Sequence, residues 1–277
     1  MAIKVENLPQ ARPQSGIQAA DLVFEEPVEA GITRFVVVYQ CAGSSHVEPV
    51  RSARLIDPLI LGQLGRVIFG FAGGIGPTLN AVRAANVFDA DFTRYPLLYL
   101  RDPYRYPPHN LYVSTYGLWQ LDPADRTPPR PLFSYSARPL PGAPANVAHV
   151  PFSSYSDVYW RYNRTTGTYD RYYGSQPALS ASGTPISAAN VVIQKAQESV
   201  TPYVEDANGV HEVMLALVGS GPVTVLRNGV AITGTWRRAS ISSRTRFYDH
   251  SGKLIGLAPG KTWIELVPST VPVTFGP

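Results

Sequence analysis

The sequence predicts a protein of mixed class, α+β or α/β, in two domains. In the first half, apolar strand-like runs alternate with helix starts and a glycine loop, which is the order typical of α/β domains. In the second half, short runs rich in valine, threonine and aromatic residues are separated by turn signals. We therefore expect an N-terminal α/β domain with a mixed sheet over residues 1–121 and a β-rich antiparallel domain over residues 148–277.

The segment between these two domains has a composition of its own. Residues 122–145 contain seven of the 26 prolines of the chain. Proline-rich segments favour extended, semi-rigid conformations. Residues 122–147 are therefore predicted to form a stiff connection and to mark the domain boundary.

The N-terminal domain begins with three predicted strands, over residues 3–6, 22–25 and 33–40. A helix with one apolar face follows, and two starts for it remain open. Ser52 can cap it through its hydroxyl, and Asp57-Pro58 places proline in a first turn, where proline is favoured.

A second strand and helix follow in the same domain. Residues 67–71 form a nearly continuous apolar run, the pattern of a strand that is covered on both faces. Pro77 suits the first turn of a helix that runs to about Ala85.

The C-terminal domain is predicted as a series of hairpins. Asn228-Gly229 is the strongest turn signal, because both residues tolerate the positive φ angles that a tight hairpin requires. The predicted strands cover residues 158–162, 168–172, 210–218, 223–226, 231–236, 246–248, 253–255 and 262–267.

The overall composition argues against several classes of function. The net charge is +4, and residues 1–121 carry ten basic and ten acidic groups, so neither nucleic acid nor another polyanion is favoured by charge excess. No apolar run is long enough to span a bilayer. Cys41 is the single cysteine, and the five histidines are scattered, which predicts no disulfide, no metal site and no cofactor. The sequence begins without a recognisable signal peptide, which we expect if a leader has been removed.

Charged residues are concentrated around the third predicted strand. A cluster of both signs can form an internal lattice of ion pairs, or it can line a polar pocket in which arginines bind an anionic or polyhydroxylated ligand. Glu29 could also carry a proton in a glycosidase-like mechanism. The members of this charged cluster are Glu25, Glu26, Glu29, Arg34, Glu48, Arg51 and Arg54.

Two further segments are candidates for the site. His109 and Asn110 lie in an aromatic, proline-broken loop, where a carboxylate could orient the histidine as a general base; alternatively, His109 fixes the turn by bonding to the backbone. Gly73 and Gly74 precede the second helix, where backbone amides can bind an anion; alternatively, they allow close packing of helix on strand. Leu79 stands where a dinucleotide fingerprint requires its third glycine, which argues against a nucleotide site.

Several short segments form a recognisable set in this order along the chain: Val5-Glu6-Asn7, Gly31-Ile32-Thr33-Arg34-Phe35, Pro49-Val50-Arg51-Ser52-Ala53-Arg54, Ala72-Gly73-Gly74, Pro108-His109-Asn110-Leu111-Tyr112, Gly234-Thr235-Trp236 and Pro259-Gly260-Lys261-Thr262-Trp263-Ile264. With them the chain resembles the YerB-like lipoprotein family of bacteria, a family of unknown function. The resemblance implies two domains and an exported protein, often with a lipid anchor upstream of the folded part. The family tends to carry His and Asp after a tyrosine-rich hairpin, where this chain has Ala178 and Ser180.

Together these observations predict an uncharacterised protein of the cell envelope that binds an anionic or glycan-like envelope ligand. The expected cleft is lined by Arg34, Arg51, Arg54, Asn110, Gly73 and Gly74, with His109 and Glu29 as its catalytic candidates. Two alternatives remain open. The protein could hydrolyse a glycosidic or phosphodiester bond of an envelope polymer, or it could be a structural or partner-binding module.

Overall fold

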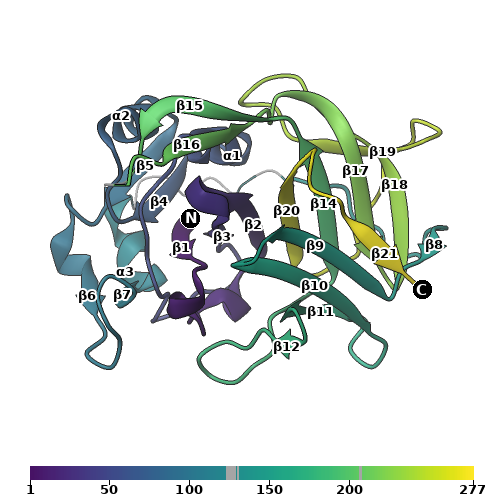
Figure 1. Cartoon of the computed structure of the whole chain (residues 1–277), viewed down its shortest axis with the longest axis horizontal. Coiled ribbons are helices and arrows are strands. Elements are labelled where there is room, and N and C mark those ends of the chain that lie inside the picture. Colours follow the sequence, from purple (N-terminus) through teal and green to yellow (C-terminus); the bar gives the residue numbers. More distant parts are fainter. Residues whose placement is uncertain (123–128, 130, 206–207) are drawn as a thin grey trace.

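The computed structural model describes residues 1–122, 129, 131–205 and 208–277. In this part, the chain is mostly β-strand with a few short helices, and its largest element is one mixed sheet in the order β19-β18-β17-β14-β20-β2-β3-β1-β4-β5, with β8 paired to β18 (Figure 1). The strands of this sheet are β1 (Ala2–Glu6), β2 (Leu22–Pro27), β3 (Thr33–Val38), β4 (Val67–Phe71), β5 (Val87–Asp91), β8 (Ala143–Pro144), β14 (Asn190–Ala196), β17 (Gly219–Arg227), β18 (Val230–Arg238), β19 (Arg246–Asp249) and β20 (Thr262–Pro268).

Smaller sheets and helices surround it. The second sheet has the order β12-β11-β10-β9-β21, with β13 paired to β11. Its strands are β9 (Val147–Ser153), β10 (Ser156–Asn163), β11 (Thr168–Tyr173), β12 (Gln176–Pro177), β13 (Ser187–Ala188) and β21 (Thr274–Gly276), and two separate hairpins are β6 (Tyr99–Arg101) with β7 (Leu111–Val113) and β15 (Glu198–Val204) with β16 (His211–Leu215). The α-helices are α1 (Asp57–Leu61), α2 (Gly76–Ala84) and α3 (Thr115–Leu118), and 3₁₀ turns cover Pro9–Ala11, Ile17–Ala19, Glu29–Gly31, Gly62–Leu64, Pro96–Leu98 and Trp119–Leu121.

The main sheet joins the two halves of the chain. Strand β20 pairs in parallel with β2 on one side and with β14 on the other, so Glu25 lies opposite Glu265. The C-terminal half is therefore not purely antiparallel, and strands from residues 1–121 and 148–277 share one hydrogen-bonded sheet. The division of the chain into two domains stays a prediction.

Side chains alternate between the two faces of β1, β2 and β3. Cross-strand pairing places Val5 and Glu25 beside Phe35 on one face, and Glu6 and Glu26 beside Arg34 on the other. The Phe35 face packs on the second sheet through Trp160 and Trp263, whose ring centroids are 5.3 Å apart. The Arg34 face packs against α1 and the chain around it.

Local signals placed several elements correctly. Helix α1 starts at Asp57 with proline in its first turn, so the Asp57-Pro58 start is confirmed and the Ser52 start is wrong. Helix α2 carries Pro77 in its first turn and ends at Ala84, close to the prediction. Asn228 and Gly229 have φ angles of 51° and 76° in the turn between β17 and β18, as expected for this hairpin.

The described part of the proline-rich connection lies against the C-terminal half. Ser136 donates its amide to Leu257, and Arg227 donates to the carbonyls of Ser136 and Arg138. Residues 123–128 and 130, which belong to the predicted stiff connection, lie outside the described residues. Within the described chain, no helix is both long and apolar enough to cross a bilayer.

Candidate functional site

The charged cluster is split between the two faces of the main sheet. Because neighbouring residues of a strand point to opposite faces, Glu25 lies on the face that packs on the second sheet, and Glu26 lies on the helix-covered face. The predicted cluster is therefore two separate arrangements, and only one of them includes the arginines of the predicted site.

On the helix-covered face, Lys4 lies between two carboxylates. Its Nζ pairs with Glu26 and is 2.7 Å from Asp57 Oδ1, and all three side chains are fully buried. One ammonium neutralises only one of the two acids. Burial and the neighbouring Asp57 raise the pKa of Glu26 to about 8, against the opposing charge of Lys4.

This shift predicts a dependence of stability on pH. The folded state holds a proton on Glu26 that the unfolded chain releases above its ordinary pKa, so the free energy of unfolding should fall as pH rises from about 4.5 to about 8. In Glu26→Gln, the amide imitates the protonated acid, and this fall should be smaller by a few kcal/mol. Urea unfolding of both proteins at pH 5, 6.5 and 8 measures this difference. If the free energy of unfolding changed with pH by the same amount in both proteins, Glu26 would not be the group with the raised pKa.

Next to this group, Glu29 binds two of the predicted arginines. Arg54 donates Nε to Glu29 Oε2 at 2.7 Å and also pairs through Nη2, while Arg34 Nη2 lies 3.3 Å from Oε1. Burial by itself would raise the pKa of Glu29, but the hydrogen bond from Arg54 and the charges of both arginines lower it to about 2. Glu29 therefore stays ionised at neutral pH and has the geometry of an ion-pair anchor rather than of a proton donor.

Arg54 also contacts a residue that precedes the turn of the β15–β16 hairpin. Its Nη1 is 2.7 Å from Glu205 Oε1, so the hairpin and the N-terminal half meet at this arginine. Burial raises the pKa of Glu205 to about 7, with Arg54 opposing the shift. Near neutral pH, Glu205 is thus only partly ionised.

A second group of charges on the same face, nearer to solvent, is built around Glu6 at the end of β1. This carboxylate is almost completely buried and accepts from Arg51 Nε at 3.1 Å, while His109 Nδ1 lies 2.8 Å from its second oxygen. The side chains of Arg51 and His109 are 27% and 20% exposed, so both remain accessible from solvent. Within the described chain, neither the terminal nitrogens of Arg51 nor Nε2 of His109 have a hydrogen-bond partner.

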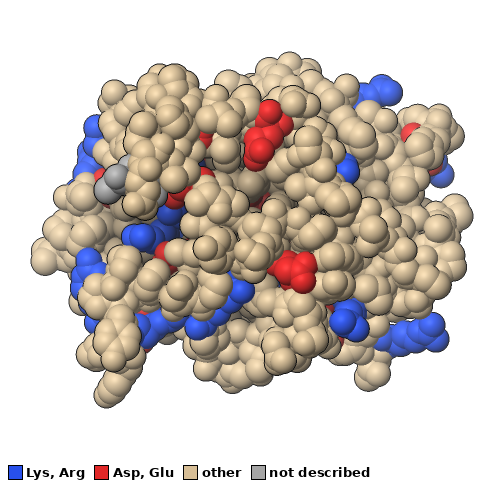
Figure 2. All heavy atoms as spheres, in the orientation of Figure 1, with Lys and Arg blue, Asp and Glu red and all other residues tan. Residues whose placement is uncertain are grey.

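These residues form one continuous chain of charges. Glu6 and Arg34 are cross-strand neighbours on the same face, so Arg34, which pairs with Glu29, also lies within the electrostatic influence of Glu6. Burial, followed by the charge of Arg54, lowers the pKa of Arg34 to about 10. Figure 2 shows basic surface gathered in a hollow on the left of the molecule, over β1 and β4, with acidic surface at its edge.

The other predicted residues have structural partners. Asn110 is buried; it accepts from Arg101 and donates to the carbonyl of Asp102, which closes the loop that carries His109. The amide of Gly73 donates to Asp91 Oδ1 at 2.8 Å. A Cβ added at Gly74 would lie 3.5 Å from the carbonyl oxygen of Ala53, an ordinary van der Waals distance, so Gly74 packs against the chain without needing to be glycine.

The loop around His109 presents aromatic rings to solvent. Tyr104 and Tyr106 are 94% and 86% exposed, and His109 donates its amide to the carbonyl of Tyr106. Exposed rings of this kind have apolar faces available for stacking.

Among the described residues, one group has a spacing that could suit a metal. Ligand atoms of His46, Glu48 and Asp102 lie within 4.8 Å of one another. However, Arg105 Nη1 is 3.1 Å from Glu48 Oε2 and already supplies positive charge there. The donor set therefore fits an internal ion pair better than a cation site.

The opposite face of the sheet holds a second buried network. Arg171 bridges Glu25 and Glu265 at 2.8 Å and 3.0 Å, with all three side chains fully buried. Ala178 donates its amide to the carbonyl of Arg171 and is itself buried. This network lies away from the exposed arginine and histidine.

The structure thus brings Arg34, Arg51, Arg54, Glu29 and His109 together, and it assigns Asn110, Gly73 and Gly74 to internal contacts. Sequence reasoning missed Glu6, which connects Arg51 to His109. A single carboxylate at the end of a short strand carries no local signal of this role.

The fold and this arrangement define a two-part, β-rich protein with a charged site on its N-terminal half. The chain matches both family models of the protein of unknown function DUF3048, the N-terminal domain over residues 1–127 and the C-terminal domain over residues 148–264. It belongs to this family, and the YerB-like resemblance is confirmed.

Two comparisons with the same relative support this assignment. The chain is 28% identical to "Putative lipoprotein YerB" of Bacillus subtilis (strain 168), over 97% of this chain and 81% of that protein. It superimposes on the crystal structure of YerB from Bacillus subtilis with a TM-score of 0.82 at 24% identity, over 99% of this chain and 93% of the other. The two proteins share their fold.

Proposed function

We propose that this protein binds an anionic, glycan-like ligand of the bacterial cell envelope at Arg51 and His109. The observation that carries the proposal is the shared carboxylate of Glu6. It holds Arg51 by Nε and His109 by Nδ1, which leaves the outer nitrogens of both side chains directed away from their internal partner. The terminal nitrogens of Arg51 are donors suited to the oxygens of a carboxylate or phosphate, and His109 Nε2, opposite the nitrogen bonded to Glu6, can accept from a hydroxyl of the same ligand.

The local charge favours an anion. Arg34, Arg51 and Arg54 face the carboxylates of Glu6 and Glu29, and the third acid, Glu205, has a pKa of about 7 because of burial. Glu212, which also lies near Arg54, has a pKa raised by burial, so protonation of Glu205 and Glu212 makes the group more positive as the pH falls. Positive charge in a hollow concentrates anionic ligands.

The neighbouring tyrosines favour a sugar rather than a simple ion. Tyr104 and Tyr106 expose nearly all of their surface in the loop that carries His109. Their ring faces can pack against the apolar face of a pyranose, while Arg51 binds its acidic substituent and His109 accepts from one of its hydroxyl groups. An envelope location is consistent with the name of the YerB relative, which describes that protein as a lipoprotein.

Arg51→Ala should weaken binding of an anionic envelope glycan, such as a soluble teichoic acid fragment, by about 10- to 100-fold, the loss expected for about 1.5–3 kcal/mol of charged hydrogen bonding. Isothermal titration calorimetry measures the affinity. Arg237→Ala is the matched control, because Arg237 is an exposed arginine on β18 of the same sheet. Because Glu6 is buried but keeps His109 as a partner, removal of Arg51 should lower the free energy of unfolding by about 1–3 kcal/mol and leave the variant folded. Unchanged affinity of Arg51→Ala for the glycan would refute the site. If the variant lost its folded structure instead, Arg51 would be a structural partner of Glu6 rather than a ligand-binding residue.

A second candidate is hydrolysis of a glycosidic or phosphodiester bond in such a ligand. It rests on the 2.8 Å contact between His109 Nδ1 and Glu6, since a carboxylate at Nδ1 orients the ring and leaves Nε2 to exchange a proton with substrate. His109→Ala should then reduce turnover of an envelope polymer by about 100-fold or more. Full turnover in this variant would exclude His109 as the proton carrier.

A further inference from the structure

We propose that a cavity at the opposite end of β2 and β3 is a binding site for a neutral, largely apolar small molecule. This inference is independent of the charged site. The cavity has a volume of about 600 Å³, which lies within the range of about 300–1,000 Å³ usual for small-molecule sites.

The cavity lies where the two halves of the chain join. Leu22 and Thr262 are register partners in the β2–β20 pair, and both line it. Leu22 begins β2, whereas Glu26 and the charged site lie near the end of that strand. Ligand sites often form where separate structural parts meet, because neither part fills the space alone.

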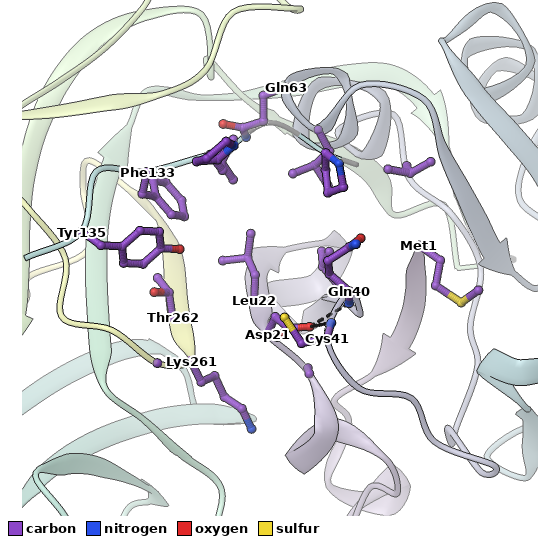
Figure 3. Close-up of a pocket in the computed structure, with 18 of the residues that line it drawn as sticks. Met1, Asp21, Leu22, Gln40, Cys41, Gln63, Phe133, Tyr135, Lys261 and Thr262 are labelled. Atoms are coloured by element: carbon purple, nitrogen blue, oxygen red, sulfur yellow. Dashed lines mark hydrogen bonds between the residues drawn. The ribbon is translucent and has the colours of Figure 1, made fainter. Parts of the chain in front are cut away.

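Its walls are mainly apolar. Figure 3 shows Leu22 rising from the strand and the rings of Phe133 and Tyr135 directed inward from the connection. The principal apolar contacts come from Leu22, Val38, Leu64, Val67, Phe133 and Tyr135. These side chains originate from four separate segments, so the cavity depends on the complete fold.

The charged groups at its lower edge are already compensated. Asp21 Oδ2 accepts the amides of Gln40 and Cys41 at 2.7 and 2.9 Å, and Lys261 donates to the carbonyls of Ile17 and Gln18. One acid and one base therefore face the same space, with protein partners for both. A ligand of either charge would meet a group of like charge, which favours a neutral molecule.

Two polar side chains of the lining, Tyr135 and Gln40, remain available for orientation. The hydroxyl of Tyr135 points across the cavity toward Leu22 (Figure 3), and within the described chain it makes no hydrogen bond. A carbonyl or hydroxyl on the ligand could pair with it. We therefore expect an apolar molecule with one such oxygen.

Two dyes of nearly equal shape test the charge preference. N-phenyl-1-naphthylamine is neutral, and 8-anilinonaphthalene-1-sulfonate carries a sulfonate on the same two ring systems. Fluorescence titration should show saturable binding of the neutral dye and binding of the sulfonate that is at least 10-fold weaker. No saturable binding of the neutral dye overturns the proposal, and equal affinity for both dyes overturns the neutral class of ligand.

A cavity-filling variant tests the location. Val38→Trp should weaken binding of the neutral dye at least 10-fold, while Val200→Trp should not, because Val200 is an exposed valine on the β15–β16 hairpin. An unchanged affinity in a folded Val38→Trp protein would place the dye elsewhere and overturn the proposal.

Cys41 provides a second measurement in the unaltered protein, which is decisive if Val38→Trp does not fold. It is the single cysteine of the chain, it is exposed, and it lines the cavity. A saturating concentration of the neutral dye should slow alkylation of Cys41 by iodoacetamide at least fivefold, and the sulfonate at the same concentration should not. Equal alkylation rates with and without the neutral dye would overturn the proposal.

Discussion

Arg171→Leu should lower the free energy of unfolding by about 3–5 kcal/mol, the loss typical of removing one partner from a buried ion pair. Arg171 is buried between Glu25 and Glu265, which are register partners on β2 and β20. Burial and the charge of Glu25 raise the pKa of Glu265 well above its ordinary value, and Arg171 is the cation that opposes this shift. Among the described residues, no other cation forms an ion pair with either of these two acids.

The deficit should also depend on pH in a defined direction. A carboxyl with a raised pKa stabilises the fold below its ordinary pKa and loses that contribution as pH rises. Arg171→Leu should therefore be less impaired at pH 5 than at pH 8, which urea unfolding at the two pH values measures.

Arg161→Leu is the matched control. Arg161 is an exposed arginine on the neighbouring strand β10, where it lies opposite Asp170, and its loss should cost no more than about 1 kcal/mol. A similar cost for both variants would contradict the special role of Arg171 between the two halves of the chain.

Lys4→Met should have a comparable effect, about 3–5 kcal/mol at pH 8, because it leaves Glu26 and Asp57 buried without their shared cation. Methionine fills much of the space of the lysine stem, so lost charge rather than lost packing dominates the change. As the pH falls toward 5, protonation of Glu26, whose pKa is already raised by burial, reduces the uncompensated charge, and the difference from the parent protein should shrink.

The control for this variant is Lys253→Met. Lys253 is exposed near the β19 strand, and its replacement should change the free energy of unfolding by about 0.5 kcal/mol or less. If Lys4→Met lowered the free energy of unfolding by as little as Lys253→Met, Lys4 would not be the cation that compensates Glu26 and Asp57.

Arg171 and Lys4 show which features of the structure the local sequence could predict and which it could not. Asp57-Pro58, Pro77 and Asn228-Gly229 act through their own backbone preferences, so they located helix starts and a hairpin without knowledge of the fold. The density of charge around β3 likewise indicated ion pairing or a polar site before any contact was known.

The partners of those charges could not be predicted. Glu25 and Glu26 are adjacent in sequence, yet one pairs with Arg171 and the other with Lys4, because strand alternation sends them to opposite faces. The face that each residue occupies depends on how β2 pairs with its neighbours. One neighbour is β20, where the partner of Glu25 is Glu265, 240 residues later in the sequence.

The same reason explains the sites. Sequence composition alone selected Arg34, Arg51, Arg54 and His109 as polar residues that could act together. Strand pairing between distant parts of the chain decided the rest. It placed Glu6 between Arg51 and His109, and it brought Leu22 and Thr262 together in the lining of one cavity. Local preferences determined the elements of this protein, and only the tertiary register determined which side chains meet, because pairing across a sheet has no signature within either strand.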